Sequence, residues 1–307
     1  MAVAQDKLHP KARAIVDQIA AMPSLTTLTP AEARGSPVPL AAAPEPVASV
    51  TARTIPGPGG PMAIRIYRPQ DVLRTALVYF HGGGWVVGSL EGADGSCRAL
   101  ANRSRSVLVS VDYRLAPETK FPGPVEDAYA AVRWVADKAS DLRIDPERIA
   151  VGGSSAGGNL AAVVALVARD RGGPRIAFQL LTVPATEFRS TARSTEEFAE
   201  GHGLTRADME WYGAHYLGTD AERDHPYASV LRADLHGMPP AFVITAECDP
   251  LRDDGEAYAK RLSELGIAAR YKRYSGMFHG FMGFPDVLPE AAQAFDDAGA
   301  AVREALG

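Results

Sequence analysis

The stretch Ile149-Ala150-Val151-Gly152-Gly153-Ser154-Ser155-Ala156-Gly157-Gly158 decides the fold of this chain. It joins a short β-branched apolar run to an alanine-rich segment that extends to Arg169 and has the composition of a helix. A G-x-S-x-G pattern between a strand and a helix is typical of a nucleophile elbow, a sharp turn from which a serine hydroxyl protrudes. The stretch therefore predicts an α/β protein that carries a candidate nucleophilic serine.

The spacing of the glycines indicates which of the two serines is the nucleophile. An elbow brings the backbone into close contact two residues before and two residues after its centre, so both positions favour the smallest side chain. Ser155 has Gly153 and Gly157 at these positions, whereas Ser154 would have Gly152 and Ala156. We therefore expect Ser155 to be the nucleophile. The alternatives are a flexible turn or a phosphate-binding loop, but the stretch lacks both the P-loop ending and the dinucleotide G-x-G-x-x-G order.

A second glycine cluster, His81-Gly82-Gly83-Gly84-Trp85, follows the apolar run Ala76–Phe80, which is typical of a buried strand. Consecutive glycines leave backbone N–H groups unshielded, and such groups can stabilise the negative charge that develops on an acyl oxygen. These N–H groups and that of Ala156 would form an oxyanion hole. We expect His81 to hold the glycine loop through hydrogen bonds, although the residue could also be read as a base.

A serine nucleophile needs an imidazole base and an acid that orients it, in the chain order serine, acid, histidine for this type of sheet. The other downstream histidines (202, 215, 225 and 236) come too early, so His279 is the candidate base. Asp249 is the candidate acid because it follows the predicted strand Pro240–Ala246 and precedes Pro250 at a rigid corner. Asp253 and Asp254 could substitute, but we expect them to charge the start of a helix over 255–265.

Five motifs in one order resemble the hormone-sensitive-lipase-like family of microbial carboxylesterases. They are His81-Gly-Gly-Gly-Trp85, Tyr113-Arg-Leu-Ala-Pro-Glu118, Gly153-x-Ser155-x-Gly157-Gly158-Asn159, Asp249-Pro250-Leu251 and His279-Gly280-Phe281, within residues 60–285. The resemblance implies an α/β-hydrolase fold with a mostly parallel central sheet, flanking helices and a helical cap. It also implies hydrolysis of short- to medium-chain acyl esters through an acyl-enzyme, without a cofactor.

Residue by residue, the resemblance places the nucleophile on Ser155, the acid on Asp249 and the base on His279. It places the oxyanion hole on Gly83, Gly84 and Ala156. Many members of the family carry Asp or Thr directly before the nucleophile, whereas this chain has Ser154.

The order of the segments predicts one catalytic domain over 51–307, preceded by an N-terminal segment and linker over 1–50. The resemblance implies that this N-terminal segment helps to form the cap. A helix is expected over 7–21, and the proline- and glycine-rich stretch 35–61 is read as an extended connection. Between about 185 and 235 the alternation of strands and helices breaks, which predicts a cap insertion above the site. An ester pocket needs apolar walls, and its candidate wall residues are Trp85, Phe188, Leu204, Met209, Trp211 and Tyr212.

The net charge, the apolar runs and the cysteine count exclude several classes of function. A formal net charge of −5 over 307 residues leaves no basic surface for nucleic acid, so we expect no nucleic-acid partner. The partner that the resemblance implies is a small-molecule ester substrate. No run is long enough to span a bilayer and no secretory leader is visible, which by default predicts a cytoplasmic location. Only Cys97 and Cys248 are present, so neither a disulfide framework nor a Cys-x-x-Cys zinc site is expected. The sequence leaves open whether the chain forms a homo-oligomer.

Two other functions are compatible with these motifs. An amidase or deacetylase could use the same three side chains, because pocket shape and proton delivery decide the preferred leaving group. The second alternative is a non-catalytic small-molecule receptor on the same fold, similar to the plant gibberellin receptor. In that receptor, another residue stands where the enzymes of the family have the catalytic histidine. His279 is retained here, which favours catalysis.

Overall fold

A computed structural model describes residues 7–36 and 44–307 and contains, within them, one eight-stranded sheet. The strands follow each other across the sheet in the order β1-β2-β4-β3-β5-β6-β7-β8. The pairs β1/β2 and β2/β4 are antiparallel and all the others are parallel. The bounds are β1 Ser49–Gly57, β2 Gly60–Arg68, β3 Ala76–Phe80, β4 Val107–Val111, β5 Ile149–Ser154, β6 Phe178–Thr182, β7 Ala241–Cys248 and β8 Ala269–Phe278. The expected mostly parallel sheet is confirmed.

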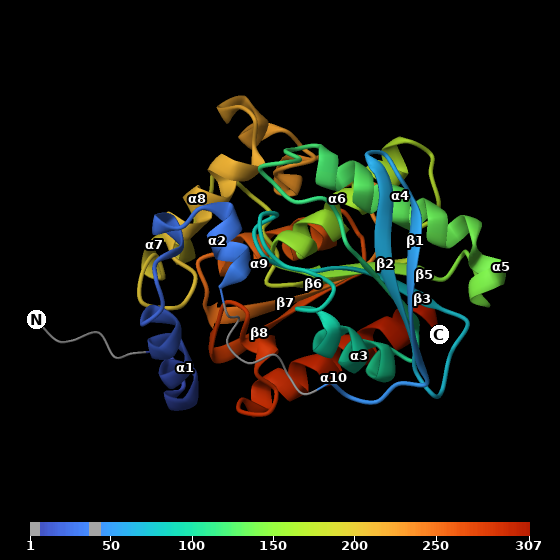
Figure 1. Cartoon of the computed structure of the whole chain (residues 1–307), viewed down its shortest axis with the longest axis horizontal. Coiled ribbons are helices and arrows are strands. Elements are labelled where there is room, and N and C mark those ends of the chain that lie inside the picture. The colour runs from blue at the N-terminus through green and yellow to red at the C-terminus, as the bar shows by residue number, and fades with distance from the viewer. Residues whose placement is uncertain (1–6, 37–43) are drawn as a thin grey trace, which may run out of the picture.

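Helices cover both faces of this sheet (Figure 1). On one face lie α4 (Gly123–Asp137), α6 (Ala156–Asp170) and α9 (Arg252–Glu264), and on the other α1 (Pro10–Ala20), α3 (Asp94–Ser104) and α10 (Pro289–Leu306). Successive side chains of β3 point to opposite faces of the sheet. Ala76, Val78 and Phe80 pack in the apolar core beneath α4, α6 and α9, and Leu77 and Tyr79 pack in the core beneath α1, α3 and α10. Strands that are buried on both faces explain the continuous apolar runs in the sequence.

The remaining helices are short or belong to the group that borders the site. The helices α2 (Pro30–Gly35), α7 (Arg193–Glu197) and α8 (Arg206–Tyr216) gather with α1 at one end of the molecule, on the left in Figure 1. We call these four the cap helices. Thr205 caps α8: its hydroxyl accepts from the Asp208 N–H at 3.0 Å, and the Asp208 carboxylate accepts from the Thr205 N–H at 3.0 Å. The helix α5 (Ala139–Leu142) lies away from them.

The predicted strands and helices agree with the structure to within about three residues at their ends, except at one place. Residues 35–61 are not only a connection, because β1 occupies Ser49–Gly57 and pairs with β2 as an antiparallel hairpin. This strand lies at the sheet edge and buries only Ile55, so it leaves no apolar run in the sequence. The segment before His279 is a strand, β8, which continues to Phe278. Part of the predicted connection, residues 37–43, lies outside the described residues.

No helix in the described part of the chain is both long enough and apolar enough to cross a membrane. The predicted division into residues 1–50 and 51–307, with a cap insertion at about 185–235, remains a prediction. Helices α7 and α8 lie within that insertion, and α1 and α2 lie within the N-terminal segment.

Candidate active site

Ser155 stands on a strained turn between β5 and α6. Its φ of 56° and ψ of −117° are unusual for a residue with a side chain. A Cβ on Gly157 would lie 2.0 Å from the Phe80 carbonyl oxygen, and one on Gly153 would lie 2.2 Å from the Gly157 oxygen. A Cβ on Gly152 would have its closest contact at 3.0 Å. The close backbone contacts therefore flank Ser155 and not Ser154, which is the frame predicted from the glycine spacing.

The pairing of β7 with β8 brings Asp249 and His279 together. Cys248 and Phe278 are paired residues at the ends of these strands, so the residues that follow them leave the sheet at the same point. The His279 Nδ1 lies 2.8 Å from Asp249 Oδ2, and its Nε2 lies 2.9 Å from Ser155 Oγ. Asp249 is fully buried, and its other oxygen accepts from the Leu251 N–H at 2.8 Å. With Nδ1–H donating to the carboxylate, Nε2 is free to accept the serine proton.

Neither of the two alternative acids contacts His279. Asp253 and Asp254 lie in the first turn of α9, which begins three residues earlier than expected. Asp253 accepts from the Ser194 N–H at 2.9 Å and pairs with Arg252 at 2.7 Å. Asp253 and Asp254 therefore place negative charge in the first turn of α9, as expected, and Asp253 also binds the first turn of α7.

The glycine loop lies beside Ser155 and has a conformation that only glycine adopts readily. Gly83 and Gly84 have φ values of 115° and 57°. A Cβ on Gly83 would lie 2.2 Å from the Val87 oxygen, and one on Gly84 would lie 2.0 Å from the ring of Tyr212. Ala156 is buried directly after Ser155, as the first residue of α6.

His81 holds this loop through hydrogen bonds, as expected. Its Nδ1–H donates to the Gly82 oxygen at 2.8 Å, and its own carbonyl accepts from the Tyr113 hydroxyl at 2.9 Å. Burial lowers the pKa of His81 to about 4, so the imidazole is neutral at physiological pH. The ring stacks on Tyr113 with a centroid distance of 4.4 Å.

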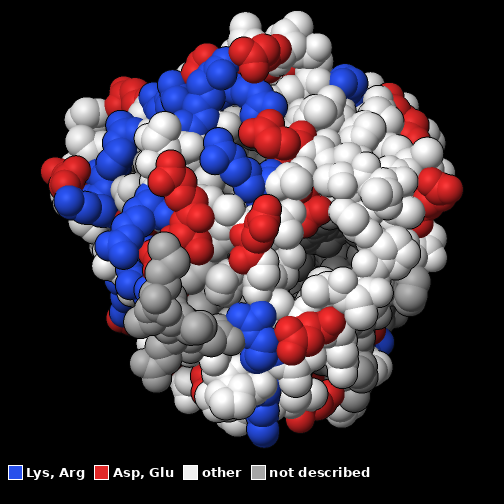
Figure 2. Space-filling view, turned by 90° about the vertical axis from the view of Figure 1, so that its left-hand side faces the viewer, with Lys and Arg blue, Asp and Glu red and all other residues white. Residues whose placement is uncertain are grey.

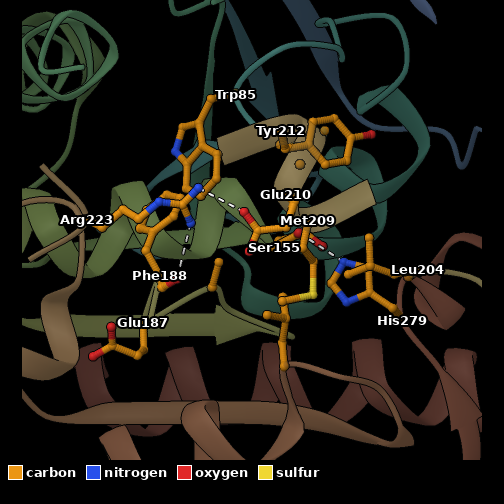
Figure 3. A pocket seen from close by; sticks show the side chains of 17 residues that line it. Trp85, Ser155, Glu187, Phe188, Leu204, Met209, Glu210, Tyr212, Arg223 and His279 are labelled. Atoms are coloured by element: carbon orange, nitrogen blue, oxygen red, sulfur yellow. Dashed lines mark hydrogen bonds and ion pairs between the residues drawn. The ribbon is translucent and has the colours of Figure 1, made fainter. Parts of the chain in front are cut away.

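A cavity of about 310 Å³ opens above Ser155 and His279. Five of the six predicted wall residues line it: Trp85, Phe188, Leu204, Met209 and Tyr212. Gly83 and Gly84 line it as well. In Figure 3, Leu204 and Met209 lie on the side of His279, whereas Phe188 and Arg223 lie on the opposite side. On the face that carries the cap helices, Figure 2 shows a hollow whose rim is mostly uncharged.

Trp211 is the sixth predicted wall residue, and it does not line this cavity. Its ring packs edge-on against His215 at 4.4 Å and against Tyr212 at 5.3 Å. Met209 and Tyr212 are three residues apart and share one side of α8, while Trp211 projects in another direction. Trp211 therefore belongs to the expected helix, but its side chain does not line this cavity.

Three charged residues line the same cavity and escaped the sequence analysis: Glu187, Glu210 and Arg223. Arg223 donates to Glu210 at 2.9 Å and lies 3.2 Å from Asp220. Glu187 pairs with Arg232 at 2.7 Å. The cavity thus has a charged wall in addition to its apolar walls. Within residues 7–36 and 44–307, no three His, Cys, Asp or Glu side chains are grouped so that they could hold a metal ion.

Comparisons with known proteins agree with this architecture. Residues 77–283 match the model of a family with the alpha/beta hydrolase fold, and this match spans Ser155, Asp249 and His279. The carboxylesterase NlhH of Mycobacterium tuberculosis is 43% identical over 249 residues, which is 79% of this chain and 78% of that protein. An arylesterase of Saccharolobus solfataricus is 42% identical and covers 73% of this chain and 74% of its own. A solved hyperthermophilic esterase from Pyrobaculum calidifontis has a TM-score of 0.91 at 44% identity, and the match covers 97% of this chain and 98% of that one.

Proposed function

This chain belongs to the alpha/beta hydrolase fold family, in the class of hormone-sensitive-lipase-like carboxylesterases, and from that membership we propose that it hydrolyses short- to medium-chain acyl esters on Ser155. It is a carboxylic ester hydrolase by the same comparisons. The observation that carries the mechanism is the hydrogen-bonded series from Asp249 through His279 to Ser155, at 2.8 and 2.9 Å.

The reaction has two steps. Ser155 Oγ forms a bond to the ester carbonyl carbon while its proton passes to His279 Nε2, and Asp249 stabilises the imidazolium. The N–H groups of Gly83, Gly84 and Ala156 hold the oxyanion until the ester C–O bond breaks. The leaving alcohol takes the proton from His279. Water then repeats the sequence on the acyl-enzyme, which releases the acid and restores the serine hydroxyl.

The volume and lining of the cavity support small esters as substrates. About 310 Å³ is near the lower end of the range for small-molecule sites. The proposed wall residues for substrate are Trp85, Phe188, Leu204, Met209 and Tyr212. Their apolar surfaces favour an acyl or alcohol group of modest length.

A Ser155→Ala variant tests the mechanism. We expect its kcat on p-nitrophenyl butyrate to fall at least about 10³-fold, because no other group in the proposed mechanism attacks the carbonyl. The matched control is Ser154→Ala, which removes the adjacent hydroxyl and should keep kcat within about tenfold of the wild type. Circular dichroism and thermal unfolding show whether both variants are folded. Undiminished turnover by folded Ser155→Ala would refute the mechanism.

The amidase or deacetylase alternative uses the same series of side chains, and matched pairs of esters and amides decide between them. We expect the esters to be cleaved faster, because the relatives with assigned activities are esterases.

The receptor alternative predicts slow or absent labelling of Ser155 by an organophosphate. The proposed hydrolase predicts stoichiometric labelling, because His279 accepts the proton of the attacking serine. The cytoplasmic location remains a prediction, which cell fractionation tests. Light scattering determines whether the chain forms a homo-oligomer.

A further inference from the structure

The glycine loop over 82–88 carries backbone strain at Trp85, whose φ is 62°. Gly83, Gly84 and Gly88 also have positive φ values, which glycine adopts without this cost. A residue with a side chain in this region costs on the order of 1–3 kcal/mol, and it persists only where its surroundings hold it. Some contacts of this chain must therefore keep the loop in place beside Ser155.

Part of that support comes from the loop and its immediate neighbours. The N–H groups of Val86 and Val87 donate to the Gly83 oxygen at 3.0 and 2.9 Å. The Ala116 N–H donates to the Trp85 oxygen at 2.9 Å. The Trp85 ring stacks on Tyr216 at 4.3 Å. The carbonyl of Val86 points in another direction and accepts from a residue of the N-terminal segment.

That residue is Arg34, in the last turn of α2. Its Nε–H donates to the Val86 oxygen at 2.8 Å, and its Nη2–H donates to the Ala116 oxygen at 2.7 Å. The same guanidinium donates to both carboxylate oxygens of Glu118, at 2.8 and 2.6 Å. One planar group therefore joins three segments: α2, the glycine loop and the loop that contains Ala116 and Glu118. A lysine could not reproduce this arrangement, because it lacks the fixed fork of donors.

The two carbonyl contacts matter more than the ion pair. The Glu118 side chain is 64% exposed, so its attraction to Arg34 is weakened by solvent. The hydrogen bonds from Arg34 lower the pKa of Glu118 to about 2, and the pair stays ionised at the pH of an esterase assay. Ala116 links Arg34 to the glycine loop through its backbone: its N–H donates to the Trp85 oxygen, and its carbonyl accepts from Arg34.

We propose that Arg34 is a positioning residue, which holds the glycine loop in the conformation that stabilises the oxyanion. The proposal rests on the hydrolase mechanism proposed above. Arg34 acts through the backbone of Val86 and Ala116 and takes no part in bond making. Its loss should let the loop relax toward ordinary φ values, and a displacement of about 1 Å in a reacting geometry can cost about 10²-fold in rate.

The first test compares Arg34→Met with Arg13→Met. Arg13 is the matched control, because it lies on α1 of the same group of cap helices and donates to the Gly201 oxygen at 2.8 Å, away from the glycine loop. We expect Arg34→Met to lower kcat on p-nitrophenyl butyrate about 10²-fold while KM changes less than about threefold. Arg13→Met should keep kcat within about twofold.

A second readout separates positioning from a loss of stability. A trifluoromethyl ketone forms a tetrahedral adduct with the serine, and its oxygen occupies the oxyanion hole. Its affinity for Arg34→Met should fall by the same factor as kcat/KM, because both depend on the oxyanion donors. Millimolar guanidinium should restore part of the kcat of Arg34→Ala, whose short side chain leaves room for the cation, and should leave Arg13→Ala unchanged. Unchanged kcat and unchanged ketone affinity in folded Arg34→Met would overturn the proposal.

Two milder variants keep the test decisive if Arg34→Met does not fold. Glu118→Gln keeps both carbonyl contacts of Arg34, whereas Arg34→Lys replaces the two nitrogens that make them with one ammonium and loses the fixed planar geometry. The proposal therefore expects a lower kcat for Arg34→Lys than for Glu118→Gln, and equal wild-type values for both would overturn it. An inactive Ser155→Ala beside a fully active Arg34→Lys would leave the hydrolase mechanism in place and remove only the role of Arg34.

Discussion

Asp254 is a carboxylic acid held almost wholly inside the protein. It is 6% exposed, and its Oδ2 has no hydrogen-bond partner within the described residues. Burial raises the pKa of Asp254 to about 6, and the nearby charges of Glu187 and Asp253 add to this effect. The neighbouring Asp253 shows the opposite shift: burial opposes ionisation, but hydrogen bonds from Arg252 and the Ser194 N–H lower the pKa of Asp253 on balance.

These shifts predict opposite pH dependences of stability for two adjacent residues. When the pKa of a carboxyl is higher in the folded than in the unfolded state, the free energy of unfolding of the protein falls as pH rises from about 4 to about 6. Asp254→Asn should therefore raise the free energy of unfolding, by about 1 kcal/mol more at pH 8 than at pH 5. Asp253→Asn should lower it at pH 8, because the carboxylate of Asp253 is favoured by folding. Urea unfolding at both pH values measures this, and an Asp254→Asn curve that follows the wild type at both would contradict it.

At the scale of the element, α8 presents only one side to the cavity. Met209 lines the cavity whereas Trp211 does not, although the two are separated by a single residue. Met209→Ala should lower kcat/KM on p-nitrophenyl butyrate about tenfold, since apolar contacts to a substrate chain are worth about 1–3 kcal/mol. Trp211→Ala should stay within about twofold in kcat/KM. A larger loss for Trp211→Ala than for Met209→Ala would mean that the other side of α8 contacts the substrate.

At the scale of the whole molecule, the N-terminal helix belongs to the core that it covers. Ile15 and Val16 of α1 are buried in the same apolar cluster as α3 and α10. The His9 N–H also donates to the Gly276 oxygen of β8 at 2.9 Å, three residues before His279. The helix therefore helps to support the strand that carries the candidate base.

This packing predicts that α1 unfolds together with the rest of the protein. Ile15→Ala should lower the free energy of global unfolding by about 2–4 kcal/mol, as expected for a truncated isoleucine in a core. Gln18→Ala on the exposed side of the same helix is the control and should change it by less than about 0.5 kcal/mol. Denaturant unfolding monitored by circular dichroism measures both values. Equal midpoints for the two variants would show that α1 detaches before the core unfolds.

The buried parallel strands were predictable because both of their faces are covered, so each one appears as an apolar run. Strand β1 was missed because an edge strand that buries one side chain has no such run. Trp211 was assigned to the wall from its type alone, since the sequence does not indicate which side of α8 faces the site. The charged wall of Glu187, Glu210 and Arg223 was missed for a related reason: separated polar residues resemble an ordinary solvated surface.

The elbow, the glycine loop and the order of Ser155, Asp249 and His279 follow from the amino-acid sequence alone. These features depend on local backbone geometry, and the glycines and strand ends that such geometry requires are visible in the residues themselves. The packing of the folded chain was needed to show which side of α8 lines the cavity, which charged residues line its wall, and that Arg34 reaches Val86 and Ala116. These contacts join segments that are far apart in the chain, and their geometry depends on how the cap helices pack against the sheet.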